Sequence, residues 1–152
     1  DIRINDYSSN ETIWNAAVAG NFGVPVIMVS GDDATAAEAK VRLGDIETAV
    51  VKWAHSFHSA TTLTPKAGQA AIRQTAERAV RRLLAGEMDP YLVQTPVDIT
   101  VRFKHYQPSQ ILAYLQMFER IDAHAVRYNA ADMEEAARTL VFLRNYRADI
   151  TP

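Results

Sequence analysis

The chain has 152 residues, 48% of them hydrophobic and 22% charged, which is typical of a globular protein with a sizeable core. Its formal net charge of −2 lacks the basic excess that a general nucleic-acid binder needs. The longest apolar run, around residues 24–29, is too short to cross a membrane. Without cysteine there is no disulfide and no thiolate metal site, which favours a cytoplasmic protein.

Helix-like and strand-like segments alternate along the first half of the chain. Residues 11–21 are rich in alanine and predict a helix, which ends before Gly23. The apolar run 24–30 predicts a strand that is buried on both faces. Residues 34–43 predict a second helix that begins after an Asp at the N-cap. Residues 48–54 predict another strand, which leads into a polar loop of Ser and Thr.

The second half continues the alternation. Pro65 predicts the start of a helix that runs to about residue 84. An apolar stripe should face the core along that helix, formed by Ile72, Ala76, Ala79, Val80, Leu83 and Leu84. Residues 97–104 alternate between apolar and polar side chains, which predicts a half-buried strand that is antiparallel or at an edge. Residues 108–118 and 130–146 predict helices, with a short strand between them that carries His124.

This order of elements predicts the fold class. It favours an α/β fold with a mixed sheet covered by helices, with about four strands and five helices. No linker or internal repeat interrupts the pattern. We therefore expect residues 1–152 to form a single α/β domain.

Three charged residues follow or lie within the predicted strands. Asp32 and Asp33 come at the carboxyl end of the strand 24–30, where open α/β sheets collect their ligands. They could bind a cation or a substrate amine, or simply form a turn and a helix N-cap. Lys52 lies inside an apolar strand and must reach a carboxylate or a cleft, as an edge residue or as a functional cation. All three are candidate substrate-binding residues.

The histidines give a weaker signal. His55 and His58 are three residues apart, but they leave a strand and enter a loop, so they lack the helical spacing that places two ligands on one metal. No third ligand stands beside them, and we interpret them as loop histidines. We interpret His105 and His124 as surface or packed residues, and the Arg residues at 78–82 as a solvated helix face.

Short motifs in a fixed order connect the chain with a known family. They are Ile4-Asn5-Asp6, Glu11 with Asn15-Ala16, Val18-Ala19-Gly20, Gly23-Val24-Pro25-Val26, Val29-Ser30-Gly31-Asp32-Asp33, Val51-Lys52 and Leu63-Thr64-Pro65. The segments 97–103 and 131–136 extend the match toward the C-terminus. As an ordered set they resemble the DppA-type D-aminopeptidases, a family of zinc metallopeptidases, over nearly the whole chain.

The resemblance implies a function and one metal ligand. It implies an aminopeptidase with two zinc ions that hydrolyses short peptides, in the best-known members those with an N-terminal D-amino acid. The family's ligands are an Asp and a Glu near the N-terminus, two histidines and a later Glu, and that later Glu falls on Glu11. Asn15 is implied to orient Glu11 or to contact substrate. Without the resemblance, Glu11 needs no role beyond a favourable position at a helix start.

The rest of the family's site has no counterpart here. The acidic motif, the metal-binding histidines and the catalytic histidine would precede Asp1, and Asn10 stands where the family commonly has Gly. We therefore expect the C-terminal half of a larger peptidase, inactive by itself. It would need an N-terminal half or a second chain, and we expect an oligomer without nucleic-acid or membrane partners. The alternative is a non-catalytic assembly or ligand-binding subunit, and the preference for D- or L-peptides stays open.

Overall fold

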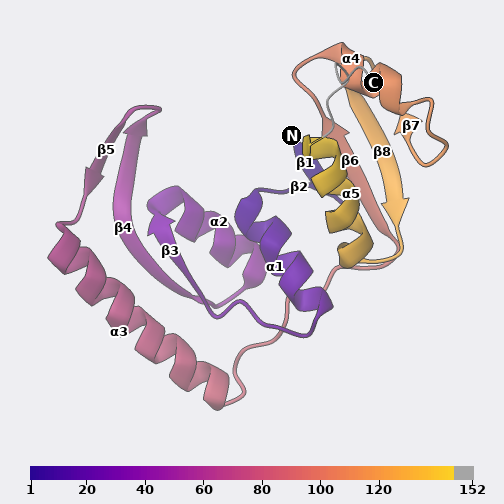
Figure 1. Ribbon diagram of the computed structural model, residues 1–152. Helices are drawn as coiled ribbons and strands as arrows, with labels where there is room; N and C mark the ends of the chain where they lie inside the picture. The colour runs from indigo at the N-terminus through magenta and orange to yellow at the C-terminus, as the bar shows by residue number, and fades with distance from the viewer. Residues whose placement is uncertain (146–152) are drawn as a thin grey trace. The chain divides into compact units, whose positions relative to one another are not determined.

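The computed structural model describes residues 1–145 (Figure 1). Contacts within the chain divide it into two compact units. Unit 1 contains residues 1–21 and the chain from residue 92 onward, and unit 2 contains residues 22–91. The described residues form five helices and eight strands, so the helix number is as predicted and the strand number is higher. The single domain expected from the sequence stays a prediction.

Unit 1 is built on a five-stranded antiparallel sheet in the order β2-β1-β6-β8-β7. Its central strand β6 (Val97–Arg102) pairs with β1 (Ile2–Ile4) on one side and β8 (Ala125–Ala130) on the other. The edges are β2 (Tyr7–Ser8) and β7 (Glu119–Arg120). The antiparallel pairing of residues 97–102 is confirmed, and β6 lies inside the sheet because strands pair with it on both sides.

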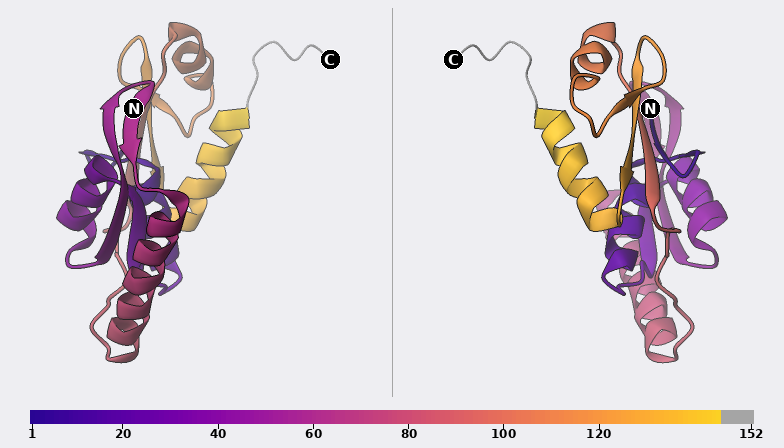
Figure 2. Two further views of the ribbon diagram at one scale, coloured as in Figure 1. Left: turned by 90° about the vertical axis from the view of Figure 1, so that its left-hand side faces the viewer. Right: turned by 90° about the vertical axis from the view of Figure 1, so that its right-hand side faces the viewer.

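Apolar and polar residues alternate along β6, and the apolar ones form the core of unit 1. Val97 and Ile99 are fully buried and Val101 is 6% exposed, whereas Asp98 between them is half-buried. Helix α5 (Met133–Asn145) contacts β6 and β8, and Figure 2 shows it beside these strands in both views. The apolar side of the sheet is therefore closed by a helix, as a half-buried strand pattern requires.

The helices of unit 1 follow the sequence with shifted ends. Helix α1 (Glu11–Asn21) has the predicted bounds and packs on α5. Helix α4 (Tyr106–Leu112) is shorter than the predicted 108–118, and α5 begins at Met133 rather than at residue 130. Residue 146, the predicted end of the last helix, lies outside the described residues.

Unit 2 is built on a three-stranded mixed sheet in the order β3-β4-β5. Strands β3 (Met28–Asp32) and β4 (Glu47–Ser56) are parallel and are joined through α2 (Asp33–Leu43). Strand β5 (Ser59–Thr62) returns antiparallel to β4, and α3 (Pro65–Leu84) follows it. Both helices contact β3 and β4, which confirms the predicted α/β class with helices on a mixed sheet.

Two predictions for unit 2 are wrong. Residues 24–27 are not a strand, because Pro25 has no N–H to donate to a ladder, and Val24 is 54% exposed. The strand begins at Met28 and is half-buried rather than enclosed on both faces. The polar residues after β4 form the strand β5 of a hairpin, because β-branched Thr61 and Thr62 suit a pleated strand as well as a loop.

Helix α3 differs most from its predicted role. Within its apolar stripe only Ala79 is buried, and Leu84 is 82% exposed. The helix contacts no strand other than β3 and β4 in the described chain, so most of the stripe has nothing to cover it. Of the Arg residues at 78–82, Arg82 binds Glu47 of β4 at 3.3 Å and Arg78 binds the same carboxylate at 3.0 Å, whereas Arg81 is exposed as a solvated face requires. Ion pairs to β4 therefore add to the limited burial of α3 at Thr75 and Ala79.

Because β6 forms the centre of the core of unit 1, shortening one of its buried side chains should lower the stability of the unit considerably. We expect Ile99→Ala to lower the free energy of unfolding by about 2–5 kcal/mol, because a fully buried side chain leaves a cavity. The neighbouring, partly exposed Thr100→Ala is the control and should cost less than about 1 kcal/mol. Urea unfolding measures both, and equal losses would contradict a core centred on β6.

Candidate functional site

Unit 1 contains an open groove with a volume of about 830 Å³. Residues of α1, β6 and α5 contribute to its lining. The residues that matter for its chemistry are Glu11, Trp14, Asn15, Val18, Arg102 and Leu140. The groove thus combines an apolar floor with a few polar groups, the combination that ligand sites commonly have.

One face of α1 supplies the groove's candidate metal ligand. Glu11, Trp14, Asn15 and Val18 follow the spacing of three, four and seven residues that places side chains on one side of a helix. Glu11 and Asn15 are both exposed, and neither side chain makes a hydrogen bond or ion pair within the described residues. The carboxylate of Glu11 is therefore available to a ligand, with an amide one turn further along.

Asn10 determines where this helix begins. Its Oδ1 accepts a hydrogen bond from the Ile13 amide at 2.9 Å, and its carbonyl accepts one from the Trp14 amide at 3.0 Å. These contacts make Asn10 the N-cap and Glu11 the first residue of α1, next to the positive end of the helix dipole. In the sequence Asn10 stood out only because the family commonly has Gly at this position. Asn before a helical run is nevertheless a known N-cap signal, and it could have predicted this role.

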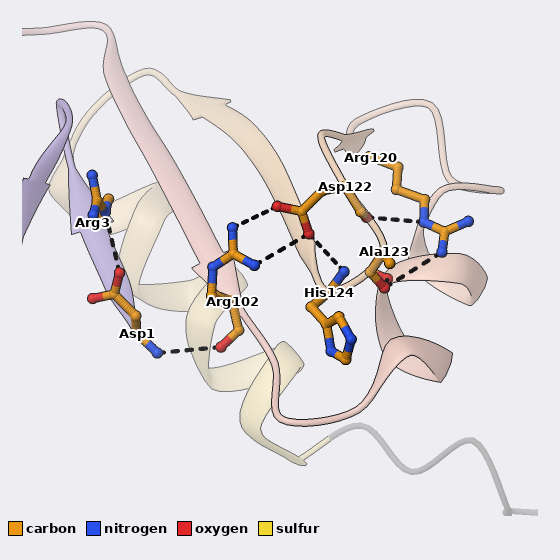
Figure 3. Close-up of polar contacts among 8 residues, drawn as sticks. Asp1, Arg3, Arg102, Arg120, Asp122, Ala123 and His124 are labelled. Carbon is orange, nitrogen blue, oxygen red and sulfur yellow. Dashed lines mark hydrogen bonds and ion pairs between the residues drawn. The ribbon is translucent and has the colours of Figure 1, made fainter.

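Arg102 is a second groove residue that sequence reasoning missed. Figure 3 shows its guanidinium facing Asp122, with Nη1 to Oδ1 at 3.3 Å and Nη2 to Oδ2 at 2.5 Å. The hydrogen bonds from Arg102 and from the His124 amide lower the pKa of the Asp122 carboxyl. Arg120 fastens the same turn by donating to the Asp122 and Ala123 carbonyls at 3.2 and 3.4 Å. The cation on the groove wall is thereby held in one orientation.

The other candidates lie in unit 2 and do not line this groove. Asp32 Oδ1 accepts a hydrogen bond from the Thr35 amide at 2.7 Å, which confirms the N-cap interpretation. This hydrogen bond lowers the pKa of Asp32, and the charge of Lys52 adds a smaller effect. Lys52 is exposed and stands opposite Asp32 in the register of β3 and β4. Asp33, also exposed, is the first residue of α2.

The histidines do not form a metal site with these carboxylates. His55 belongs to strand β4 rather than to a loop, and its Nε2 lies 2.7 Å from Thr61 Oγ1. His58 lies in the turn and packs edge-on against Phe57 at 4.7 Å. Across residues 1–145, no group of three or more His, Asp or Glu side chains could hold a metal. Glu11 fits zinc chemistry as one carboxylate ligand, and the described residues do not complete the set.

The N-cap role of Asp32 predicts a pH-dependent stability. Its pKa in the folded chain is lower than the ordinary value of 3.8, so the carboxylate stabilises the fold above that pH. This contribution is lost as the pH falls through the lower folded pKa. We expect Asp32→Ala to destabilise unit 2 at pH 7 and to match the parent chain in strong acid. Urea unfolding at both pH values measures this, and a difference that persists in acid would contradict it.

Asp33→Ala is the matched control for this experiment. Asp33 is the adjacent carboxylate on the same helix turn, and it accepts no hydrogen bond within the described structure. Its loss removes a helix-dipole interaction but leaves the N-cap in place. We therefore expect a smaller decrease in the free energy of unfolding at pH 7 than for Asp32→Ala.

Comparisons with known proteins agree with one another. The D-aminopeptidase family model matches residues 1–142. The D-aminopeptidase of Bacillus subtilis (strain 168) is 31% identical over 145 residues, which make up 92% of this chain and 51% of the relative. The solved Zn-dependent D-aminopeptidase DppA from Bacillus subtilis, described as a self-compartmentalizing protease, has a TM-score of 0.88 and 25% identity, over 99% of this chain and 55% of that chain.

Each match covers a larger share of this chain than of the relative. Nearly all of this chain is matched, but it spans only about half the length of the relatives. The family match covers most of the chain, including α1 with Glu11 and Asn15, both units of the fold and the strand β6. The chain therefore belongs to the D-aminopeptidase family.

Proposed function

We propose that this chain is part of a zinc-dependent aminopeptidase that hydrolyses short peptides, including peptides with an N-terminal D-amino acid. In this proposal Glu11 is a zinc ligand. The observation that carries it is the exposed, unpaired Glu11 carboxylate at the start of α1, on the wall of the groove in unit 1. Family membership and the zinc dependence of the Bacillus subtilis relative support it.

The residues around Glu11 have defined tasks in this proposal. The N-cap at Asn10 positions the Glu11 carboxylate, and Asn15 one turn later lies close enough in sequence to orient it by a hydrogen bond. Zinc, when bound, would polarise the scissile carbonyl and supply a water of lowered pKa. The apolar side chains of Trp14 and Val18 in the same groove would contact the side chain of the bound peptide.

We infer that the remaining zinc ligands come from polypeptide outside this chain. Catalytic zinc ordinarily has three protein ligands, and the described residues bring no three suitable side chains together. The relatives are about twice as long as the matched segment. An N-terminal half or a second chain would supply the other ligands and the catalytic histidine, and would complete a site for two zinc ions.

Unit 2 would then contribute to substrate binding. Lys52 is exposed at a register position opposite Asp32, so its ammonium group could bind a peptide carboxylate. The carboxylate of Asp33 is exposed at the start of α2 and suits a substrate amine. Asp32 would act mainly by capping α2, because one of its oxygens is already taken by the Thr35 amide.

We infer an oligomer, because the Bacillus subtilis structure is described as self-compartmentalizing. A cytoplasmic location agrees with the absence of cysteine. Within residues 1–145 no helix has the length and apolar character that a membrane span demands.

A non-catalytic assembly or ligand-binding subunit is the second candidate. The incomplete ligand set among the described residues favours it for this chain by itself. The two candidates differ in what accompanies the native protein. The peptidase requires a further polypeptide with metal-binding histidines and about two zinc ions per complete site, whereas the subunit requires neither. Native and denaturing mass analysis with metal content on one sample distinguishes them.

The role of Glu11 predicts a loss of metal without a loss of fold. Losing a hydrogen-bonding partner of a zinc ligand lowers metal affinity or activity about 10–100-fold. Because Glu11 is proposed as a ligand itself, Glu11→Gln should lower zinc affinity by about 100-fold or more. We expect zinc content and peptide hydrolysis to fall together, while thermal unfolding stays close to that of the parent. The assay uses the chain with whatever polypeptide co-purifies.

Glu134→Gln is the matched control for Glu11→Gln. Glu134 lies in the first turn of α5 in the same unit, pairs with Arg138 and does not line the groove. It should keep zinc and activity. Retained zinc in Glu11→Gln, or unfolding in place of metal loss, would contradict the proposed ligand role.

The role of Lys52 predicts an effect on substrate affinity. A hydrogen bond to a charged group is worth about 1.5–3 kcal/mol, so Lys52→Met should raise KM by about 10-fold or more with little change in kcat. Lys66→Met is the control, because Lys66 is an exposed lysine of α3 in the same unit. Steady-state kinetics with D- and L-dipeptides measures both, and an unchanged KM would remove Lys52 from the binding site.

A further inference from the structure

The hairpin of β4 and β5 is an exposed arm of unit 2. Every residue from Lys52 to Thr62 is exposed, and Phe57 at its tip is 96% exposed. Figure 1 shows the two strands running out together as a narrow ribbon. A two-stranded hairpin is at best marginally stable in water, so an arm of this kind gains stability when something covers it.

The outer edge of β5 is free in the described chain. β5 pairs with β4 on one side and contacts no other helix or strand. Its sequence, Ser-Ala-Thr-Thr, contains no charge and no proline, and no Asp, Glu, Lys or Arg occurs between Lys52 and Lys66. Edge strands usually carry charge or proline to prevent pairing with other chains, and β5 lacks both of these protections.

The other edges differ from β5. In unit 1 the edge strands β2 and β7 are only two residues long, and β7 consists of Glu119 and Arg120. In unit 2 the opposite edge strand β3 is half-buried and contacts both α2 and α3. Among the described strands, β5 therefore combines full exposure, absence of charge and a free row of backbone groups.

We propose that β5 pairs with β5 of a second copy of this chain in an antiparallel, two-fold symmetric contact. The inference rests on the self-assembly part of the proposed function and identifies the surface that carries it. A two-fold contact brings the residue on its axis against its own copy, and a charge there would oppose a like charge and destabilise the pair, so a neutral strand suits this contact. The neutral Ser, Ala and Thr side chains of β5 meet that condition.

The chain suggests where the axis passes. With the two-fold axis at Ala60, the small side chains of the two Ala60 residues meet, and Ser59 of one copy faces Thr61 of the other. The two three-stranded sheets then join into one sheet of six strands.

A cysteine cross-link tests this contact directly, because the chain has no cysteine of its own. Opposed Cα atoms of an antiparallel pair lie about 4.5–5.5 Å apart, within the range of about 4.4–6.8 Å that a disulfide spans. We expect Ala60→Cys to form a covalent dimer of this chain under mild oxidation. Ala37→Cys, at an exposed position of α2, is the control and should stay largely uncross-linked.

A charge substitution supplies the second readout. Ala60→Lys would bring two ammonium groups together at the axis, and it should lower the native mass measured with the full chain and any co-purifying polypeptide. Ala60→Ser is the neutral control and should keep the parent mass. Should Ala60→Lys fail to fold, the cross-link alone decides.

Two results would overturn the proposal. If the parent contains several copies but Ala60→Cys cross-links no better than Ala37→Cys, assembly uses another surface and the rest of the proposed function stands. If the parent contains one copy only, both this contact and the proposed self-assembly fail. Zinc binding at Glu11 is measured separately and is decided by its own variant in either case.

Discussion

The hydrogen bond from the Ile13 amide to Asn10 Oδ1 is the local interaction on which the candidate site depends. It sets the first turn of α1, and the first turn places Glu11 at the positive end of the helix with its carboxylate exposed. If the helix began one residue later, Glu11 would become its N-cap and its carboxylate would turn to the helix's own amides. The cap therefore keeps the proposed ligand free for a metal.

Packing in unit 1 holds that helix in place. α1 lies on α5, the Asn21 side chain accepts a hydrogen bond from the Met133 amide at 3.3 Å, and α5 in turn covers the central strand β6. Tyr128 in the neighbouring strand donates to the Ala136 carbonyl at 3.0 Å, and burial raises the pKa of its hydroxyl. A buried core thus supports a groove whose functional groups lie at its surface, an arrangement that keeps a site rigid while leaving it accessible.

Local patterns predicted the elements that depend on local chemistry. The alanine-rich run of α1, Pro65 at the start of α3 and the alternation of β6 each act within a few residues, and all three are found. The strands β2 and β7 pair with strands only a few residues away in the chain, but at two residues each they are too short to show an alternating pattern. The proposed role of Glu11 comes from family resemblance, because its own surroundings in sequence indicate only an ordinary helix start.

The central claim is that Glu11 binds zinc in a site completed by polypeptide outside this chain. A crystal structure of the native, zinc-loaded protein with anomalous scattering at the zinc edge tests it most directly. We expect a zinc ion about 2.0–2.2 Å from a Glu11 carboxylate oxygen, with its other protein ligands on a segment that is not part of these 152 residues. Zinc bound away from Glu11, or a complete ligand set drawn from this chain alone, would contradict it.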